Sequence, residues 1–206
     1  MIDHLVYAVP DLDAACADIE SRFGVRPSPG GKHTGRGTHN ALLDLGDGAY
    51  LEVIGPDPEQ PQPERPRPFG IDRIAVARLV TWAVKAAGDI DERVSRAKGQ
   101  GYDPGPVLSM SRARPDGVTL AWRLTQREEL GGDGLVPFLI DWGDTPHPAA
   151  TAAKGCRLVT FRAEHPRPKL ILPLLEAIGE RLEVREGPHP RLIAEIATPR
   201  GRVELS

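Results

Sequence analysis

Cysteine and long apolar runs are scarce in this sequence. Two cysteines, Cys16 and Cys156, stand among 206 residues, which is too few for a disulfide framework and favours buried thiols in a reducing compartment. No apolar segment is long enough to span a bilayer, and Asp3 and His4 interrupt the N-terminus before a signal-peptide pattern can form. These absences predict a cytoplasmic protein with no membrane partner.

Neither sign of charge dominates, and several catalytic motifs are missing. Lysine and arginine number 26 against 29 acidic residues, for a net charge of -3 and a pI of about 6.1. This balance argues against a nucleic-acid partner. The sequence contains no Gly-x-Ser-x-Gly nucleophile motif and no Cys-x-x-Cys pair. Its glycine-rich stretches GGKHTG and GRGTHN lack the spacing of phosphate-binding loops, so a nucleotide cradle is rejected.

Proline is abundant and unevenly distributed. Six of the 21 prolines fall within PDPEQPQPERPRPFG, residues 56–70. Because proline removes a backbone donor and fixes φ, this stretch is predicted to be a linker or an extended strap. The chain as a whole has 40% hydrophobic and 27% charged residues, which is ordinary for a globular protein with its own core.

The pattern of apolar residues repeats along the chain. Residues 1–55 read as a strand, a helix and three further strands. The same order recurs in residues 71–143 and, more compactly, in residues 155–206, with a loop at residues 144–154 between them. We therefore expect an α+β protein in which repeated βαβββ modules form one continuous domain.

The clearest local signal is a hairpin in the first module. Asp47-Gly48 is a typical type I′ turn between two apolar runs, and it predicts that Leu43 faces Glu52. On that register His39 shares a face with Glu52, because side chains alternate along a strand. A bulge near residue 40 would put Asn40 there instead, so both residues are candidates to contact a substrate.

Three segments together resemble a known superfamily. DHLVYAVPDLDAA and GTHNALLDLGDGAYLEVIG are similar to the first module of the vicinal oxygen chelate superfamily. PFLIDWG followed by HPAA narrows the resemblance to its glyoxalase-like domain proteins. The resemblance implies a curved mixed sheet around a cleft. It also implies a divalent metal, such as nickel, zinc, iron or manganese, that chelates neighbouring oxygens of a small-molecule substrate.

A histidine and a glutamate interrupt apolar strands of the first module. His4 matches the superfamily's first-strand ligand position, and Glu52 matches its fourth-strand position. An ionised carboxylate in an apolar strand needs a partner, so both side chains are expected to line the cleft. They are candidate catalytic residues and metal ligands. The alternative is that they simply hydrogen-bond each other, or water, in a polar cleft.

The second module does not repeat this pair. Aligning the two helix starts sets Trp82 opposite His4, and aligning the glycines that follow the strands sets Ile140 opposite Glu52. Neither tryptophan nor isoleucine binds a metal. Asp141 is one residue away and would turn inward only with a bulge. The candidate metal ligands are therefore His4 and Glu52, with either Asp141 or His39.

Further candidates for substrate binding come from the second module. Its tryptophans are either an aromatic wall for a flat or apolar ligand or ordinary core residues; they are Trp82, Trp122 and Trp142. Arginines on its predicted strands either hold an anionic group of the substrate or lie in solvent; they are Arg112, Arg114 and Arg123.

The leading hypothesis is a small-molecule enzyme with isomerase or lyase chemistry on a substrate with adjacent oxygens. Glu52 would be a metal ligand or general base, and His4 a metal ligand or acid. The main alternative is a non-catalytic protein that sequesters an apolar compound, as the bleomycin-binding members of the superfamily do. A third reading is an assembly module with a vestigial cleft. The resemblance also suggests a homodimer.

Overall fold

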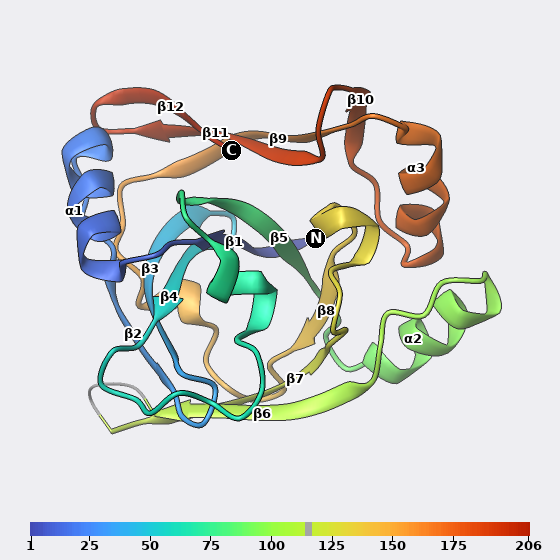
Figure 1. Cartoon of the computed structure of the whole chain (residues 1–206), viewed down its shortest axis with the longest axis horizontal. Coiled ribbons are helices and arrows are strands. Elements are labelled where there is room, and N and C mark those ends of the chain that lie inside the picture. Colours follow the sequence, from blue (N-terminus) through green and yellow to red (C-terminus); the bar gives the residue numbers. More distant parts are fainter. Residues whose placement is uncertain (114–116) are drawn as a thin grey trace.

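The computed structural model describes residues 1–113 and 117–206, which form one β-sheet of eight strands and one of four, flanked by helices (Figure 1). Arg114 lies outside the described residues. The element order β-α-β-β-β occurs three times along the chain. This arrangement confirms the α+β fold class expected from the sequence.

The first unit builds half of the eight-stranded sheet. It comprises β1 (Ile2–Ala8), α1 (Leu12–Phe23), β2 (Ser28–His33), β3 (Thr38–Gly46) and β4 (Ala49–Pro56). Helix α1 begins where the Asp11 carboxylate accepts a hydrogen bond from the Ala14 backbone N–H at 2.9 Å. It ends at Gly24, whose φ of 79° lies in the left-handed region.

The second unit builds the other half of this sheet. It comprises β5 (Arg78–Lys85), α2 (Ile90–Gly99), β6 (Val107–Ala113), β7 (Thr119–Thr125) and β8 (Phe138–Asp141). A short 3-10 turn at Gly131–Gly134 precedes β8. Another, at Pro148–Ala150, follows it and leads toward the third unit.

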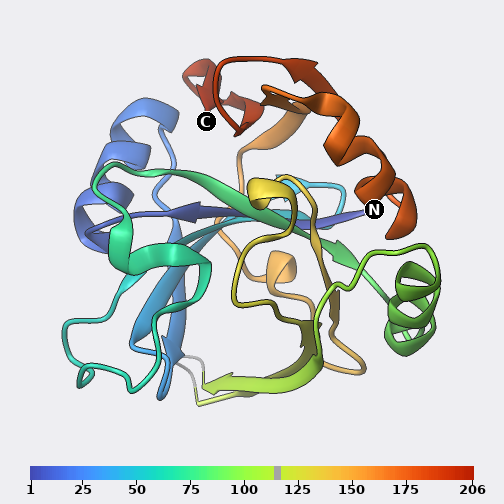
Figure 2. The ribbon, with the colours of Figure 1, turned by 45° about the vertical axis from the view of Figure 1, so that its right-hand side comes forward.

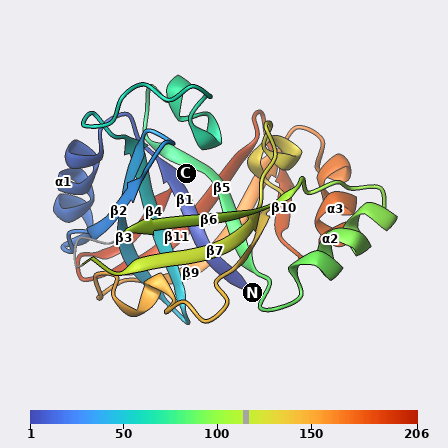
Figure 3. The ribbon, with the colours of Figure 1, turned by 90° about the horizontal axis from the view of Figure 1, so that it is seen from below.

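The eight-stranded sheet curls until its two edges meet. Its order is β2-β3-β4-β1-β5-β8-β7-β6, with β1 parallel to β4 and antiparallel to β5. Seen from below, β6 and β7 cross in front of β2, β3 and β4 (Figure 3). The Arg112 guanidinium on β6 donates to the Gly30 backbone oxygen on β2, which links the two edges. The sheet therefore surrounds a central space.

The third unit covers the outer face of this curved sheet (Figure 1). It comprises β9 (Arg157–His165), α3 (Pro168–Ala177), β10 (Glu183–Glu186), β11 (Arg191–Thr198) and β12 (Gly201–Leu205). The main hydrophobic core lies between the two sheets, where Leu5 and Trp82 of the large sheet cluster with Ala163 and Leu192 of the small one. This packing leaves the inner face of the curved sheet free to line a cavity.

The proline-rich segment predicted as a linker or strap runs from β4 to β5 across the front of the curved sheet (Figure 2). It ends in a 3-10 turn at Pro68–Arg73. Phe69 in this turn has a φ of 60°, which is rare for a residue with a side chain. Its ring stacks on Phe138 of β8 at a centroid distance of 5.7 Å. The segment thus forms part of the wall around the central space.

The β3–β4 hairpin has the predicted turn but a shifted register. Gly46 pairs with Ala49, as the Asp47-Gly48 turn requires, but the pairing slips between Asp44 and Gly46. As a result Leu42, rather than Leu43, faces Glu52. The bulge lies at the turn end of β3 and not near residue 40, and it reverses the face of every residue before it.

The helices are short, and both cysteines are buried and unpaired. Within the described residues, no helix combines the length and apolar character needed to cross a membrane. Cys16 lies on the buried side of α1, and Cys156 precedes β9. Burial raises the pKa of Cys156 to about 11, so this thiol stays protonated and unreactive at neutral pH.

Candidate active site

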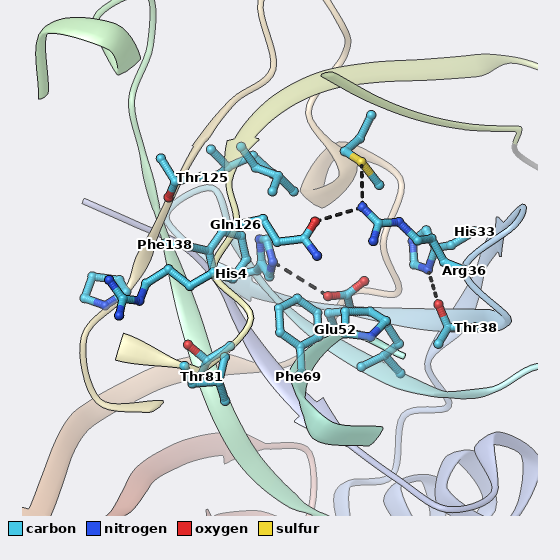
Figure 4. A pocket seen from close by; sticks show the side chains of 18 of the residues that line it. His4, His33, Arg36, Thr38, Glu52, Phe69, Thr81, Thr125, Gln126 and Phe138 are labelled. Carbon is cyan, nitrogen blue, oxygen red and sulfur yellow. Dashed lines mark hydrogen bonds and ion pairs between the residues drawn. The ribbon is translucent and has the colours of Figure 1, made fainter. Parts of the chain in front are cut away.

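The curved sheet, the proline-rich segment and the loop after β7 enclose a cavity of about 630 Å³. This volume is in the range of small-molecule binding sites. Polar groups of the first unit meet aromatic and aliphatic side chains of the second around it (Figure 4). His4 of β1 and Glu52 of β4 both line the cavity, as the sequence led us to expect.

The imidazole of His4 is oriented by a hydrogen bond to Asp3, its neighbour in the chain. The β1–β5 pairing slips between Ile2 and His4, and this irregularity at Asp3 brings two consecutive side chains together. The His4 Nδ1–H donates to Asp3 Oδ1 at 2.7 Å, and the imidazole stacks on Tyr50 with centroids 4.7 Å apart. These contacts fix the ring so that Nε2 faces the cavity.

Asp3 is fully buried and accepts three hydrogen bonds. Besides His4, its donors are Trp142 Nε1 at 3.1 Å and His147 Nε2 at 2.9 Å. The Ala149 N–H donates to His147 Nδ1, so the ring proton of His147 belongs on Nε2. Burial by itself raises the pKa of Asp3, but the hydrogen bonds and charges of the two histidines outweigh it and hold this pKa well below its usual range.

Glu52 is fixed by an amide from the neighbouring strand. Asn40 Nδ2 donates to Glu52 Oε1 at 2.5 Å. The other carboxylate oxygen, Oε2, is 3.7 Å from His4 Nε2, which is beyond hydrogen-bond length. The two side chains therefore face each other without a direct hydrogen bond. The gap between them opens to the cavity.

The Asn40 amide fits because the opposite strand has a glycine. A Cβ atom at Gly30 would lie 2.1 Å from Asn40 Oδ1, so any larger residue there would displace the amide. Asn40 Oδ1 is itself buried and has no hydrogen-bond partner among the described residues. The hairpin register thus makes Asn40, and not His39, the residue that donates a hydrogen bond to Glu52.

A second histidine, His33 of β2, lines the cavity near Glu52. Its Nδ1 is 3.0 Å from the Thr38 hydroxyl, and its ring meets Trp122 edge to face. Burial lowers the pKa of His33 to about 4; Glu52 opposes this shift, whereas the nearby Arg112 and Arg36 charges add to it. His33 is therefore neutral at physiological pH.

Two of the three tryptophans form an aromatic wall. Trp122 and Trp142 line the cavity with ring centroids 5.1 Å apart. Phe138 continues the wall and touches the His4 ring edge to face at 5.5 Å. A flat or apolar ligand could stack on this surface beside the His4–Glu52 pair.

Comparison with known proteins identifies the family. The sequence model of the glyoxalase-like domain matches residues 2–179. The chain belongs to the glyoxalase-like domain family, within the vicinal oxygen chelate superfamily. The match includes both halves of the curved sheet and extends into the third unit. No functionally curated protein matches the sequence.

Three solved structures are similar to this family member at low sequence identity, one of them with a TM-score above 0.5. A hypothetical protein from Staphylococcus aureus superposes with a TM-score of 0.63 and 13% identity, over 98% of this chain and 83% of its own. A Mycobacterium tuberculosis methylmalonyl-CoA epimerase gives 0.45 and 20%, over 72% and 91%. A Streptomyces coelicolor methylmalonyl-CoA epimerase variant gives 0.45 and 21%, over 68% and 95%. At such identities the likeness concerns the fold alone.

Members of this superfamily often use divalent metals, but the donor set of this chain fits one poorly. Nowhere in residues 1–113 and 117–206 do three or more His, Cys, Asp or Glu side chains gather as metal ligands would. His4 Nε2 and Glu52 Oε2 are two suitable donors. On the second half of the sheet, Thr81 and Ile140 face the same cavity. Two donors from one half do not make the four-ligand set that the superfamily implies.

Trp82 requires a correction, because it lies in the core between the sheets and not in the cavity. It is 1% exposed, its Nε1 donates to the Leu135 oxygen at 2.8 Å, and its ring meets Phe161 edge to face. The connection from β5 to α2 is one residue longer than that from β1 to α1. Aligning the helix starts therefore misplaced the strand, and Thr81 is the residue of the second unit that corresponds to His4.

The structure also moves His39 and Asp141 away from the cavity. Asn40 points at Glu52, so His39 belongs to the opposite face of β3, where its charge acts on Asp57. Ile140 lines the cavity, and the adjacent Asp141 faces away and accepts the Gly143 N–H at 3.0 Å. Neither His39 nor Asp141 can complete a metal site with His4 and Glu52 in this arrangement.

The two remaining arginines differ in position. Arg112 lines the cavity, whereas Arg123 is exposed and pairs with Asp91 at 2.8 Å.

Sequence reasoning missed Asp3, His147 and His33. An acidic residue directly before a strand histidine was the available signal for Asp3. No local pattern pointed to His33 or His147, because tertiary contacts bring them to the site.

Proposed function

We propose that this family member is a small-molecule enzyme that transfers a proton on a substrate with adjacent oxygens, in an isomerase or lyase reaction. The observation that supports it is the facing pair of His4 Nε2 and Glu52 Oε2, 3.7 Å apart in the cavity wall. Asp3 holds His4 and Asn40 holds Glu52, so both groups are oriented before a substrate binds.

The two groups have complementary parts in this proposal. Glu52 takes a proton from a carbon next to a carbonyl group, and His4 gives a proton to the neighbouring oxygen. The buried Asp3 carboxylate accepts the His4 Nδ1–H, so Nε2 is the ring nitrogen that exchanges a proton with the substrate. Protonated Glu52 then gives its proton to the same carbon or to the neighbouring one, and His4 takes a proton back from a hydroxyl group of the enediol, which restores both side chains. No electrons leave the substrate, so the step needs no external oxidant.

A metal is not part of this step. If nickel, zinc, iron or manganese binds, His4 and Glu52 are the side chains that would hold it. Metal analysis by plasma mass spectrometry tests this point, on protein purified without a His-tag and reloaded with each metal before dialysis. We expect well under one equivalent to be retained. One full equivalent, absent from a His4→Ala, Glu52→Ala double variant, would show that the cavity is a metal site.

Solvent exchange tests the proton transfer even while the product of the reaction is unidentified. The protein would be incubated in D2O with 2-oxoaldehydes, hydroxyketones and 2-hydroxy acids, and loss of C–H signals would be followed by proton NMR. We expect exchange next to a carbonyl for one of these classes, and its loss in Glu52→Gln. The His39→Gln variant is the matched control, because His39 lies on the same hairpin but faces away from the cavity. Exchange that survives in Glu52→Gln would contradict the proposal.

A non-catalytic binding protein is the second candidate, because the second half of the sheet presents an apolar and aromatic wall. Trp122, Trp142 and Phe138 would supply the affinity through stacking. In that case Glu52→Ala would leave ligand affinity nearly unchanged, and no variant would alter solvent exchange. The two buried, unpaired cysteines support a reducing, cytoplasmic location for either candidate.

A further inference from the structure

Arg36 places a positive charge in the cavity wall without an acidic partner. It lies in the turn between β2 and β3 and is half-buried. Its Nη2 donates to Gln126 Oε1 at 2.8 Å and lies 3.5 Å from Met110 Sδ (Figure 4). Both partners are neutral. Among the described residues, no carboxylate forms an ion pair with Arg36.

Two other arginines around the cavity form no ion pair in the described part of the chain, although the Asp103 carboxylate acts on the charge of Arg127. Arg65 lies on the proline-rich segment, and Arg127 follows β7. Arg127 donates to the backbone oxygens of Asp103 and Glu129, which carry no charge. The charged residues of the described lining are Arg36, Arg65, Arg67, Arg112 and Arg127 against Glu52 and Glu128. Arginines thus outnumber carboxylates in the lining although the whole chain is net negative, even though Arg67 is ion-paired with Asp72 at 2.6 Å.

The positive group lies in the same part of the cavity as the reactive pair. The Arg36 backbone N–H donates to the His33 backbone oxygen at 3.0 Å, and the Glu52 charge acts on the His33 imidazole, so both residues are close to His33. Gln126 accepts from Arg36 through its oxygen, and its Nε2 has no partner in the described residues. Arg36 and the Gln126 amide thus form a donor pair near Glu52. An uncompensated, half-buried guanidinium is costly, and an anionic ligand would remove that cost.

We infer that the substrate is an amphiphilic organic anion. Its acidic group binds Arg36 and the Gln126 amide, and its apolar body lies on the wall formed by Phe138 and Trp122. This assignment rests on the proposed function, because it takes the ligand of the cavity to be the substrate of the His4–Glu52 pair. It narrows the substrate with adjacent oxygens to one that also carries a carboxylate or a similar acid group.

A matched pair of fluorescent probes tests the charge requirement. 8-Anilinonaphthalene-1-sulfonate carries one sulfonate, and N-phenyl-1-naphthylamine is the same aromatic body without it. We expect the wild-type protein to bind the sulfonate probe at one site per chain. Arg36→Gln should weaken that binding by about tenfold or more. Its affinity for the neutral probe should change by less than about twofold, because the apolar wall is intact.

Three further variants make the result specific. Arg36→Lys should retain most of the affinity for the sulfonate probe, and Gln126→Leu should lose part of it. Arg181→Gln, which removes an exposed arginine on the third unit, should match the wild type. Naphthalene-2-carboxylate should displace the sulfonate probe, whereas naphthalene-2-carboxamide should not. Neutral-probe binding by each variant reports that the cavity is folded.

The outcomes separate the two proposals. Unchanged sulfonate binding in both Arg36→Gln and Gln126→Leu would overturn the anion assignment, as would an equal loss for both probes. Those results would leave the solvent-exchange test of Glu52 untouched. Conversely, a clear charge preference with no solvent exchange on any carboxylate-bearing substrate would keep Arg36 as an anion site. The acid–base proposal alone would then fail.

Discussion

The two halves of the eight-stranded sheet follow the same element order but present different side chains to the cavity they share. The first half contributes His4 on β1 and Glu52 on β4. On its first and last strands the second half contributes Thr81 of β5 and Ile140 of β8. The first half thus carries the titratable pair, and the second half carries much of the apolar wall.

This difference shows that a repeated backbone need not carry repeated chemistry. The strands of the two halves curve around one space, so a single set of polar groups can serve a substrate held against the opposite wall. Supporting contacts differ in the same way. Asp3 and Asn40 satisfy the polar groups of the first half, whereas aromatic stacking organises the second. Fold therefore predicts the place of the site but not its chemistry.

The largest predicted effect comes from removing the pair on the first half. His4→Gln and Glu52→Gln should each lower the exchange or turnover rate by about 10² to 10⁴-fold, because a positioned acid or base is lost. Thr81→Ala and Ile140→Val on the second half should lower it by less than about tenfold. Rates for the substrate found by solvent exchange would be measured for all four variants, with circular dichroism to monitor folding. Equal losses in the two halves would contradict this division.

Asp3→Asn should give the largest loss of stability. Removing one charge from a buried network costs about 3 kcal/mol in the free energy of unfolding, measured by urea denaturation at pH 7. The folded-state pKa of Asp3 lies below its ordinary value of 3.8, so its stabilising effect is present above pH 3.8 and is lost as the pH falls further. The variant should therefore resemble the wild type at very low pH. Asp141→Asn, on the second half, should change the free energy of unfolding by only about 0.5 kcal/mol, as is usual for surface sites.

His33 should make stability depend on pH between about 4 and 6.5. Its folded-state pKa is about 4 against 6.5 in the unfolded chain, so the unfolded state binds more protons in this window. Stability should rise with pH there by up to about 3 kcal/mol from this residue alone. Subtracting the His33→Gln curve from the wild-type curve isolates the contribution. A difference that stays flat from pH 4 to 6.5 would show that His33 is not buried in its neutral form.

The Gly30→Ala variant tests whether the hydrogen bond from Asn40 to Glu52 depends on the space beside Gly30. The new Cβ would meet Asn40 Oδ1 at 2.1 Å, so the amide must move and stability should fall by about 2 kcal/mol. Activity should fall as well, because Glu52 loses its donor. In an Asn40→Ala background the same change should cost little, and thermal melts of the four variants give the coupling energy. Additive effects would mean that Gly30 and Asn40 do not share this contact.

Much of the fold could be read from local patterns in the chain. Helix α1 begins at the Asp11 cap and ends at Gly24 because these signals act over a few residues. His4 and Glu52 stood out because charged or titratable groups inside apolar strands require a polar setting. The βαβββ order and the location of a cavity between its halves followed from these patterns and from the family resemblance.

The details of the site depended on contacts between distant segments. A single slipped pair near the hairpin turn replaced His39 by Asn40, and one extra residue before α2 turned Trp82 away from the cavity. Likewise, the irregular strand pairing at Asp3 places its carboxylate beside His4. His147, far along the chain, then donates a hydrogen bond to the same carboxylate.

The sequence by itself determined the type and order of the elements, because capping, turn formation and apolar periodicity are local. Only the tertiary structure decided which side chains share the cavity. Side chains alternate along a strand, so a shift of one residue in register exchanges the two faces. That register is set by hydrogen bonds and packing between strands far apart in the chain. The facing pair of His4 and Glu52 could therefore be named from the sequence. Only the fold revealed the contacts of Asp3 and His33 and decided between His39 and Asn40.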